Sequence, residues 1–304
     1  MKSMHGPLLA CIVVGSLALP QQARAQGASG TIQKIRDTGV IALGVRDSSL
    51  PFSYIDGRND HVGYAVDICF RIVEALKREL NLPQLKTEKT AVTSSNRIPL
   101  MSNGTIDLEC GSTTNNAERQ KQVAFGPTYL LTASKFVAKK SANLKGLEDL
   151  RGKPVVSTAG STNIVQLTRA NADQKLDITV IAARDHGEAF LMVETGRAAA
   201  FVMDDVIIAG LVASSKDPDA YALGDHAFSK PEPYGFMLRR NDPEFKALVD
   251  RVAADVYRTE GKALYAKWFQ APVPPNNLNL RFPMSPPLEA AFARPTDSPD
   301  PDAY

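Results

Sequence analysis

The chain has few residues of the kinds that carry metal or nucleophilic chemistry. Of its 304 residues, 3 are cysteines and 4 are histidines, and the histidines are too far apart in sequence to suggest a metal site. GxSxG, HExxH, a phosphate-binding loop ending in GK[ST] and GxGxxG after a strand are all missing. The sequence therefore predicts no catalytic residue and no cofactor.

Long apolar runs are also rare, and the one present is at the N-terminus. Lys2 is followed by LLACIVVGSLAL, and Ala23-Arg24-Ala25 fits a cleavage site before Gln26. The run is shorter than the about 20 residues that a transmembrane helix needs. We predict that residues 1–25 are a signal peptide and that the protein is exported and soluble; an uncleaved membrane anchor is the alternative.

Neither sign of charge is in excess. Without Lys2 and Arg24 the chain has 33 basic and 33 acidic residues, so nothing indicates nucleic acid or a membrane surface as a partner. Cys69 and Cys110 remain after cleavage. They could pair in an oxidising compartment, but both fall in apolar patterns, which favours buried thiols.

Short apolar runs alternate with amphipathic segments, which is typical of an α/β fold. Residues 38–45 and 105–110 read as strands, and residues 63–80 have apolar side chains at four-residue spacing, which predicts a helix. Residues 152–205 repeat this plan, with one helix opened by Ser161 and another capped by Asp185. Two lobes of similar plan need two crossing segments, at about 129–138 and 231–238. We predict a discontinuous lobe 1 (26–133 and 235–304) and a lobe 2 (134–234). The Pro-rich tail is expected to contain one helical stretch, LEAAF, and to have a loose end.

The stretch ECGSTTNNAERQK (109–121) follows a strand with a run of hydroxyl and amide side chains. Asn115 and Glu118 have the spacing of a capping box, which explains part of the run. A helix start with hydroxyls and Arg119 also suits a carboxylate. Similar polar clusters follow other predicted strands, so a ligand cleft between the lobes is the favoured interpretation.

Several motifs together resemble one known family. PFSY, GYAVD, TSSNRIPL, ECGSTTNNAERQ, TAGSTN, DHGEAF and GRAAAFVMDD occur in this order, and the chain resembles the polar amino-acid-binding proteins of bacterial ABC importers, solute-binding protein family 3. TSSNRIPL, ECGSTTNNAERQ and DHGEAF point to its acidic-amino-acid branch. The resemblance implies a two-lobed, type II periplasmic binding protein (a Venus flytrap) with two crossing hinge strands. Ala159, Ser161 and Cys69 depart from the pattern.

The resemblance also implies a ligand, a partner and a place. The protein would bind L-glutamate or L-aspartate in the periplasm and deliver it to the membrane permease of an ABC importer. Arg119 would hold the α-carboxylate with Ser112, Thr114 and Thr162, and Asp204 would pair with the α-ammonium. The side-chain carboxylate would be surrounded by four residues: Arg46, Ser94, Arg97 and His186. A monomer is expected, because each pair of lobes completes a site.

Charge counting supports an acidic ligand. Arg119 and Asp204 match the two charged groups of any α-amino acid, which leaves Arg46 and Arg97 as surplus cations that a side-chain carboxylate would neutralise. Glutamine should then bind about 10³-fold more weakly or worse. His186 begins a predicted helix, and a bound carboxylate should raise its pKa, so affinity should weaken as pH rises.

Two other functions remain open at this stage. Some dehydratases of cyclic acids, such as cyclohexadienyl dehydratase, resemble these binding proteins, and such an enzyme would not need Asp204 as an ammonium partner. A sensory ligand-binding domain is the other possibility. The sequence does not rank glutamate against aspartate, which differ by one methylene group worth about 1–3 kcal/mol.

Overall fold

The computed structural model describes residues 30–275 and 277–304. The predicted signal peptide lies outside the described residues. Within the described part of the chain, no helix combines the length and the apolar character that crossing a membrane requires.

The first of two five-stranded sheets has the order β5 (Lys86–Ala91), β1 (Val40–Val45), β6 (Leu108–Glu109), β15 (Met237–Arg239), β7 (Val123–Phe125). β1 runs parallel to β5 and β6, while β15 is antiparallel to its neighbours. The predicted apolar face of α2 (Tyr64–Glu79) is buried, and α2 packs against α8 (Pro243–Thr259). The other elements here are α1 (Thr31–Thr38), α3 (Arg97–Ser102), α4 (Ala117–Gln120), α9 (Gly261–Tyr265) and the small sheet of β2 (Ser48–Ser49), β3 (Ser53–Ile55) and β4 (His61–Val62).

The second sheet has the order β11 (Thr179–Ala183), β10 (Pro154–Thr158), β12 (Ala200–Asp204), β9 (Ser134–Lys139), β13 (Tyr221–Leu223). Its helices are α5 (Thr162–Gln174), α6 (His186–Glu194) and α7 (Asp205–Ser214). The predicted helix starts are confirmed. The Ser161 hydroxyl accepts from the Ile164 N–H, and the Asp185 carboxylate accepts from the Glu188 N–H, so these caps fix where the loops after β10 and β11 end.

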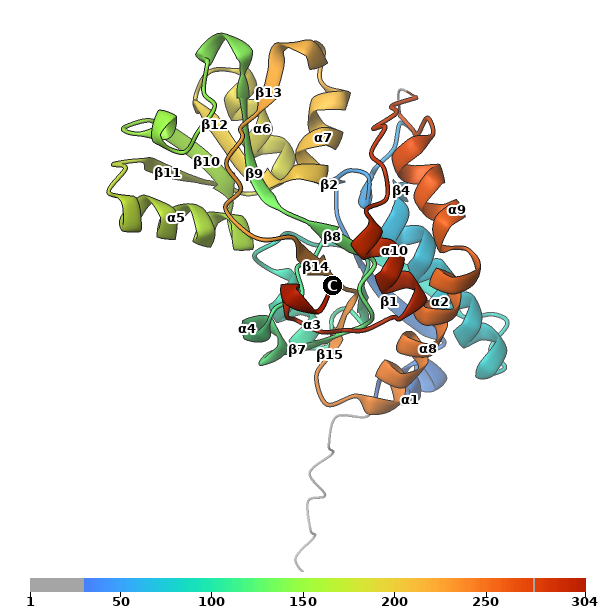
Figure 1. Cartoon of the computed structure of the whole chain (residues 1–304). Helices are drawn as coiled ribbons and strands as arrows, with labels where there is room; N and C mark the ends of the chain where they lie inside the picture. The colour runs from blue at the N-terminus through green and yellow to red at the C-terminus, as the bar shows by residue number, and fades with distance from the viewer. Residues whose placement is uncertain (1–29, 276) are drawn as a thin grey trace, which may run out of the picture.

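Two segments cross between the sheets. β8 (Leu130–Thr132) pairs antiparallel with β14 (Glu232–Tyr234), and this pair lies between the two sheets (Figure 1). β8 leads into β9 of the second sheet, and β14 leads into β15 of the first. Both crossings occur where the sequence predicts them. We propose that residues 26–133 and 235–304 form lobe 1 and that residues 134–234 form lobe 2.

The interpretation of Cys69 and Cys110 as free thiols is wrong. The two residues form a disulfide, with their Cα atoms 6.1 Å apart. Cys69 lies on the buried face of α2, and Cys110 directly follows β6. Their apolar patterns report burial correctly, since both are fully buried, but a pattern cannot show that two segments of the fold face each other. The bond ties α2 to the loop that begins at Gly111.

The expectation of a loose C-terminal end is also wrong. The predicted helix in the tail is α10 (Pro286–Ala293), and the Phe292 ring stacks on Tyr257 of α8 with centroids 4.8 Å apart. At the end of the chain, the Tyr304 hydroxyl lies 2.7 Å from the Thr128 hydroxyl, next to the first crossing segment. The proline content of the tail indicates only local chain preference. It cannot predict these long-range contacts, which order the end of the chain.

Candidate functional site

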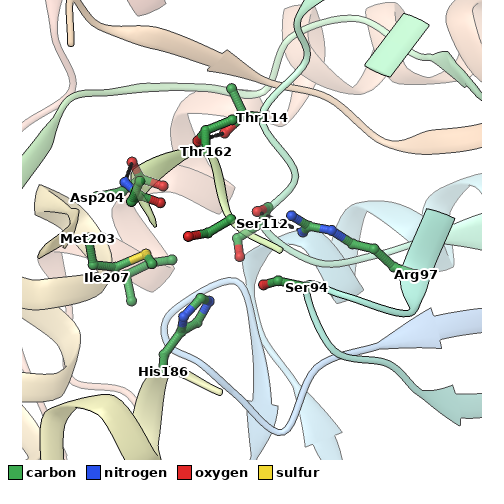
Figure 2. A pocket seen from close by; sticks show the side chains of 11 residues that line it. Ser94, Arg97, Ser112, Thr114, Thr162, His186, Met203, Asp204 and Ile207 are labelled. Carbon is green, nitrogen blue, oxygen red and sulfur yellow. Dashed lines mark hydrogen bonds between the residues drawn. The ribbon is translucent and has the colours of Figure 1, made fainter. Parts of the chain in front are cut away.

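A small cavity, with room of about 10 Å³ for the centre of a water-sized sphere, lies between the lobes. Figure 2 shows side chains from both lobes that point into it. All the predicted ligand residues except Arg46 and Arg119 line this cavity, together with four residues outside the predicted ligand set: Ser161, Asn163, Met203 and Ile207. The lining comes from the segments that follow β5, β6, β10 and β11 and from the end of β12 and the first turn of α7, as expected for an α/β fold.

Arg119 lies behind the cavity wall. One terminal nitrogen donates to the Thr114 carbonyl at 2.8 Å, and the other donates to the Gly160 carbonyl in lobe 2 at 3.2 Å. Burial lowers the pKa of Arg119 to about 9, and the neighbouring Arg97 adds to this effect. The guanidinium therefore joins the two lobes next to Thr114, whose hydroxyl lies within hydrogen-bonding distance, 3.3 Å, of the Thr162 hydroxyl.

The predicted cap of the helix that carries Arg119 is wrong by one residue. The side chain of Asn116, not Asn115, accepts from the Arg119 N–H at 2.9 Å. Asn115 turns away and donates to the Asp297 carbonyl of the C-terminal tail at 2.9 Å. Asn115 and Asn116 offer the same capping group. Because Asn115 is held by the tail, Asn116 caps the helix. The tail thereby supports the polar loop from behind.

Asp204 ends β12 and presents its carboxylate at the cavity. The Asn163 amide donates to one oxygen at 2.8 Å, and the Tyr234 hydroxyl donates to the other. Burial raises the pKa of Asp204. Asn163 is a residue that the sequence analysis missed, although its place after Thr162, buried in the first turn of α5, is a usable signal. Asn163 and Tyr234 hold the carboxylate in one orientation.

Arg46 and Arg97 are both buried. Arg97 donates from one terminal nitrogen to the Ser112 carbonyl at 3.1 Å and to the Thr113 hydroxyl at 2.5 Å. Burial lowers the pKa of Arg46 to about 10. Among the residues that the structure describes, Arg46 Nη1, Ser94 Oγ and Arg97 Nε are buried without a hydrogen-bond partner. These groups suit an oxygen-rich ligand, because buried unpaired polar atoms are costly.

Glu109 corrects the count of charges. It is fully buried at the end of β6, its Oε2 accepts from the Thr113 hydroxyl at 2.7 Å, and its Oε1 is 3.8 Å from Arg97 Nη1. The sequence count left both Arg46 and Arg97 as surplus cations, whereas this carboxylate offsets one of them. The alternation of Ile106, Leu108 and Cys110 puts Glu109 on the opposite face of the strand, so strand periodicity alone does not reveal that it is buried.

The interpretation of His186 as a charged contact is opposed by its surroundings. Its Nε2 lies 3.3 Å from Arg46 Nη2, and its Nδ1 lies 2.8 Å from the Thr158 hydroxyl. Because a guanidinium can only donate, Nε2 must accept, and a neutral ring then carries its proton on Nδ1. Burial, together with Arg46 and Arg97, lowers the pKa of His186 well below its ordinary value. The neutral His186 ring therefore accepts a hydrogen bond from Arg46 and orients its guanidinium.

Residues 41–271 match the model of the bacterial extracellular solute-binding proteins, family 3. The chain belongs to this family. It is 47% identical to an L-glutamate/L-aspartate-binding protein of Pseudomonas aeruginosa over 95% of this chain and 96% of that protein. A glutamate/aspartate import solute-binding protein of Escherichia coli is 45% identical over the same shares.

Solved structures of the family share the fold. A crystal structure of a mutant of ArgBP from T. maritima superimposes with a TM-score of 0.70 at 25% identity, covering 78% of this chain and 98% of that one. This two-lobed architecture agrees with the sheet topology and with the crossing pair β8 and β14.

The environment of His186 gives a pH prediction for this family-3 protein that reverses the one made from sequence. A neutral ring stays neutral as pH rises from 6 to 8, and protonation would bring a third positive charge beside Arg46 and Arg97. His186 should therefore change the ligand affinity by less than about twofold between pH 6 and pH 8, as measured by calorimetry at pH 6, 7 and 8. If the affinity falls progressively as pH rises and a His186→Asn variant does not show this loss, His186 is a charged contact after all.

Two glycines allow the lobes to come close. A Cβ atom on Gly160 would lie 2.7 Å from Ser95 Cα across the cavity mouth. A Cβ atom on Gly210 of α7 would lie 2.7 Å from the Leu50 carbonyl oxygen of lobe 1. Gly160 also has a φ of +76°, whereas Gly210 lies within a helix. Gly210 is therefore the position where the effect of lobe contact can be separated from backbone strain.

Gly210→Ala should weaken ligand binding without weakening the fold. Proteins of this kind close around their ligands, and the added methyl group opposes closure at a cost of about 1–3 kcal/mol, or about tenfold in affinity or more. The same change favours the helix by up to about 1 kcal/mol, so the ligand-free melting temperature should be unchanged or higher. Gly146→Ala, where an added Cβ meets nothing within 4 Å, is the control. Unchanged affinity in Gly210→Ala would show that this contact does not limit closure.

Proposed function

We propose that this protein is a periplasmic receptor that binds L-glutamate or L-aspartate between its lobes and delivers it to the membrane permease of an ABC importer. The names of the relatives from P. aeruginosa and E. coli support this ligand class. In our proposal the receptor acts as a monomer, without a cofactor and without nucleic acid as a partner.

The observation that carries the proposal is the charge balance of the cavity. Three buried guanidiniums lie in the cavity wall or behind it, those of Arg97, Arg46 and Arg119, against two buried carboxylates, those of Glu109 and Asp204. His186 is neutral, so the buried groups sum to one positive charge. An acidic amino acid at neutral pH carries one net negative charge and would neutralise this excess, whereas glutamine would leave it uncompensated in a buried site.

The residue roles follow from position. Asp204, held by Asn163 and Tyr234, is the proposed partner of the α-ammonium group. Arg119 with Thr114 and Thr162 forms one end of the cavity and is the proposed site of the α-carboxylate, with Ser112 beside it. The opposite end is the proposed place of the side-chain carboxylate. It is lined by Ser94, Arg97 and His186, and Arg46 contacts His186.

A dehydratase activity of the cyclohexadienyl type is not favoured. The curated relatives that match nearly the whole chain are binding proteins. The cavity also has a buried carboxylate, Asp204, whose orientation is fixed by two donors, as an ammonium partner requires. The charge of that residue would oppose the binding of an anionic ring acid without an amino group.

A thermal-shift panel tests the proposal. The mature chain, residues 26–304, is unfolded and refolded to remove bound ligand, then melted with L-glutamate, L-aspartate, L-glutamine, L-arginine or prephenate, a ring acid without an amino group. A ligand at 100 times its Kd stabilises by about 2.7 kcal/mol, so the two acidic amino acids should raise the melting temperature by several degrees and the others should not. Consumption of prephenate without stabilisation by any amino acid would instead indicate the enzyme.

A further inference from the structure

Glu109 lies beneath the site and contributes no wall to the cavity. It is fully buried, and among the described residues its Oε1 is one of the few buried side-chain atoms without a hydrogen-bond partner. Its nearest charged neighbour is Arg97, at 3.8 Å. The absence of a side chain at Gly111 makes room for it, since a Cβ atom there would lie 2.1 Å from Glu109 Oε1 and 2.9 Å from Arg46 Cγ. Glu109 is therefore packed beside both arginines proposed for the side-chain carboxylate.

Thr113 connects Glu109 to Arg97. The Thr113 hydroxyl accepts a hydrogen bond from Arg97 Nη1 and donates its own proton to Glu109 Oε2 at 2.7 Å. Carboxylate, hydroxyl and guanidinium thus form one chain of buried hydrogen bonds. Loss of the carboxylate charge would leave Arg46 and Arg97 with less compensation in the ligand-free protein. It would also remove the repulsion between Glu109 and an incoming carboxylate.

We propose that Glu109 is a positioning residue that acts as an internal counter-charge, sets the preference for a ligand with one net negative charge, and limits how tightly that ligand is held. This inference rests on the proposed function. A buried anion near the ligand lowers the affinity for acidic ligands in particular, because the repulsion acts on the side-chain carboxylate and is absent for an amide. A receptor that hands its ligand to a permease benefits from such a limit, since release requires moderate affinity.

Glu109→Gln isolates the charge, because the amide oxygen can still accept from Thr113. Calorimetry and stopped-flow release with L-glutamate and L-glutamine should show at least about a tenfold increase in the preference for glutamate and slower glutamate release. A merely structural role would weaken both ligands alike. Glu109→Asp retains the charge and should leave the preference near that of the wild type.

A charge-rescue pair covers the case in which Glu109→Gln does not fold. Arg46→Gln alone should reduce the preference for glutamate, and Arg46→Gln with Glu109→Gln, which returns the buried sum to one positive charge, should restore much of it. An unchanged preference in Glu109→Gln, or a double variant no better than Arg46→Gln, overturns the inference. If the wild type fails to bind either acidic amino acid, the proposed function fails instead.

Discussion

Asp204→Asn is expected to reduce the affinity for L-glutamate by about 10²- to 10³-fold. The asparagine keeps the shape of the side chain, but the ligand ammonium is left buried without a counter-charge, and breaking a buried ion pair in this way costs about 3–5 kcal/mol. The asparagine keeps one oxygen, which can still accept from Asn163. The other oxygen, which accepts from the Tyr234 hydroxyl, is replaced by an amide group that cannot accept. Isothermal titration of the refolded protein measures the loss.

The adjacent carboxylate provides a matched control for this variant. Asp205 accepts from the Thr132 hydroxyl at 2.6 Å and does not line the cavity, so Asp205→Asn should bind glutamate within about threefold of the wild type. The ammonium group is common to all α-amino acids, so Asp204→Asn should weaken glutamine in proportion. A loss below threefold, or an equal loss in Asp205→Asn, would remove Asp204 from the ammonium site.

Replacement of Cys69 and Cys110 by serine is expected to lower the free energy of unfolding by about 4 kcal/mol. The bond closes a loop with a sequence separation of 41 residues, and the loss of unfolded-chain entropy on closing a loop of that length corresponds to about 4 kcal/mol at 25 °C. Both side chains are fully buried, so the serine hydroxyls add to the cost. Urea unfolding with and without L-glutamate measures the change.

Reducing agent supplies the control for the disulfide variant. Wild-type protein unfolded and refolded in the presence of a thiol reductant should reach the stability of the double variant, and the variant should not respond. A decrease of less than about 1 kcal/mol, or an equal response of both proteins to reductant, would show that the bond does not stabilise this fold.

Local patterns were sufficient for much of the fold. The i, i+4 spacing in residues 63–80 predicted α2, and the side chains of Ser161 and Asp185 marked the starts of α5 and α6. The two crossings followed from the repetition of one α/β plan. Each of these features depends on residues close together in the sequence, which is why a single sequence contains the signal.

The errors concern contacts between distant segments. Nothing near Cys69 indicates that it faces Cys110, and nothing near Asn115 indicates that the tail at Asp297 engages its amide. Glu109 shows the same limit in the site, because a charged residue on the second face of a short strand is usually exposed. The neutral state of His186 depends on Arg46 and Thr158. These three residues lie at the ends of three different elements and meet only after folding.

The most direct test of the account is a calorimetric titration of refolded residues 26–304 with L-glutamate and L-glutamine under identical conditions. The single positive charge left by three guanidiniums and two carboxylates predicts one-to-one binding of glutamate and an affinity for glutamine about 10³-fold lower or worse. That result would establish the receptor and the charge balance together. Binding of glutamine within tenfold of glutamate would contradict the charge argument, although the family and the fold would stand.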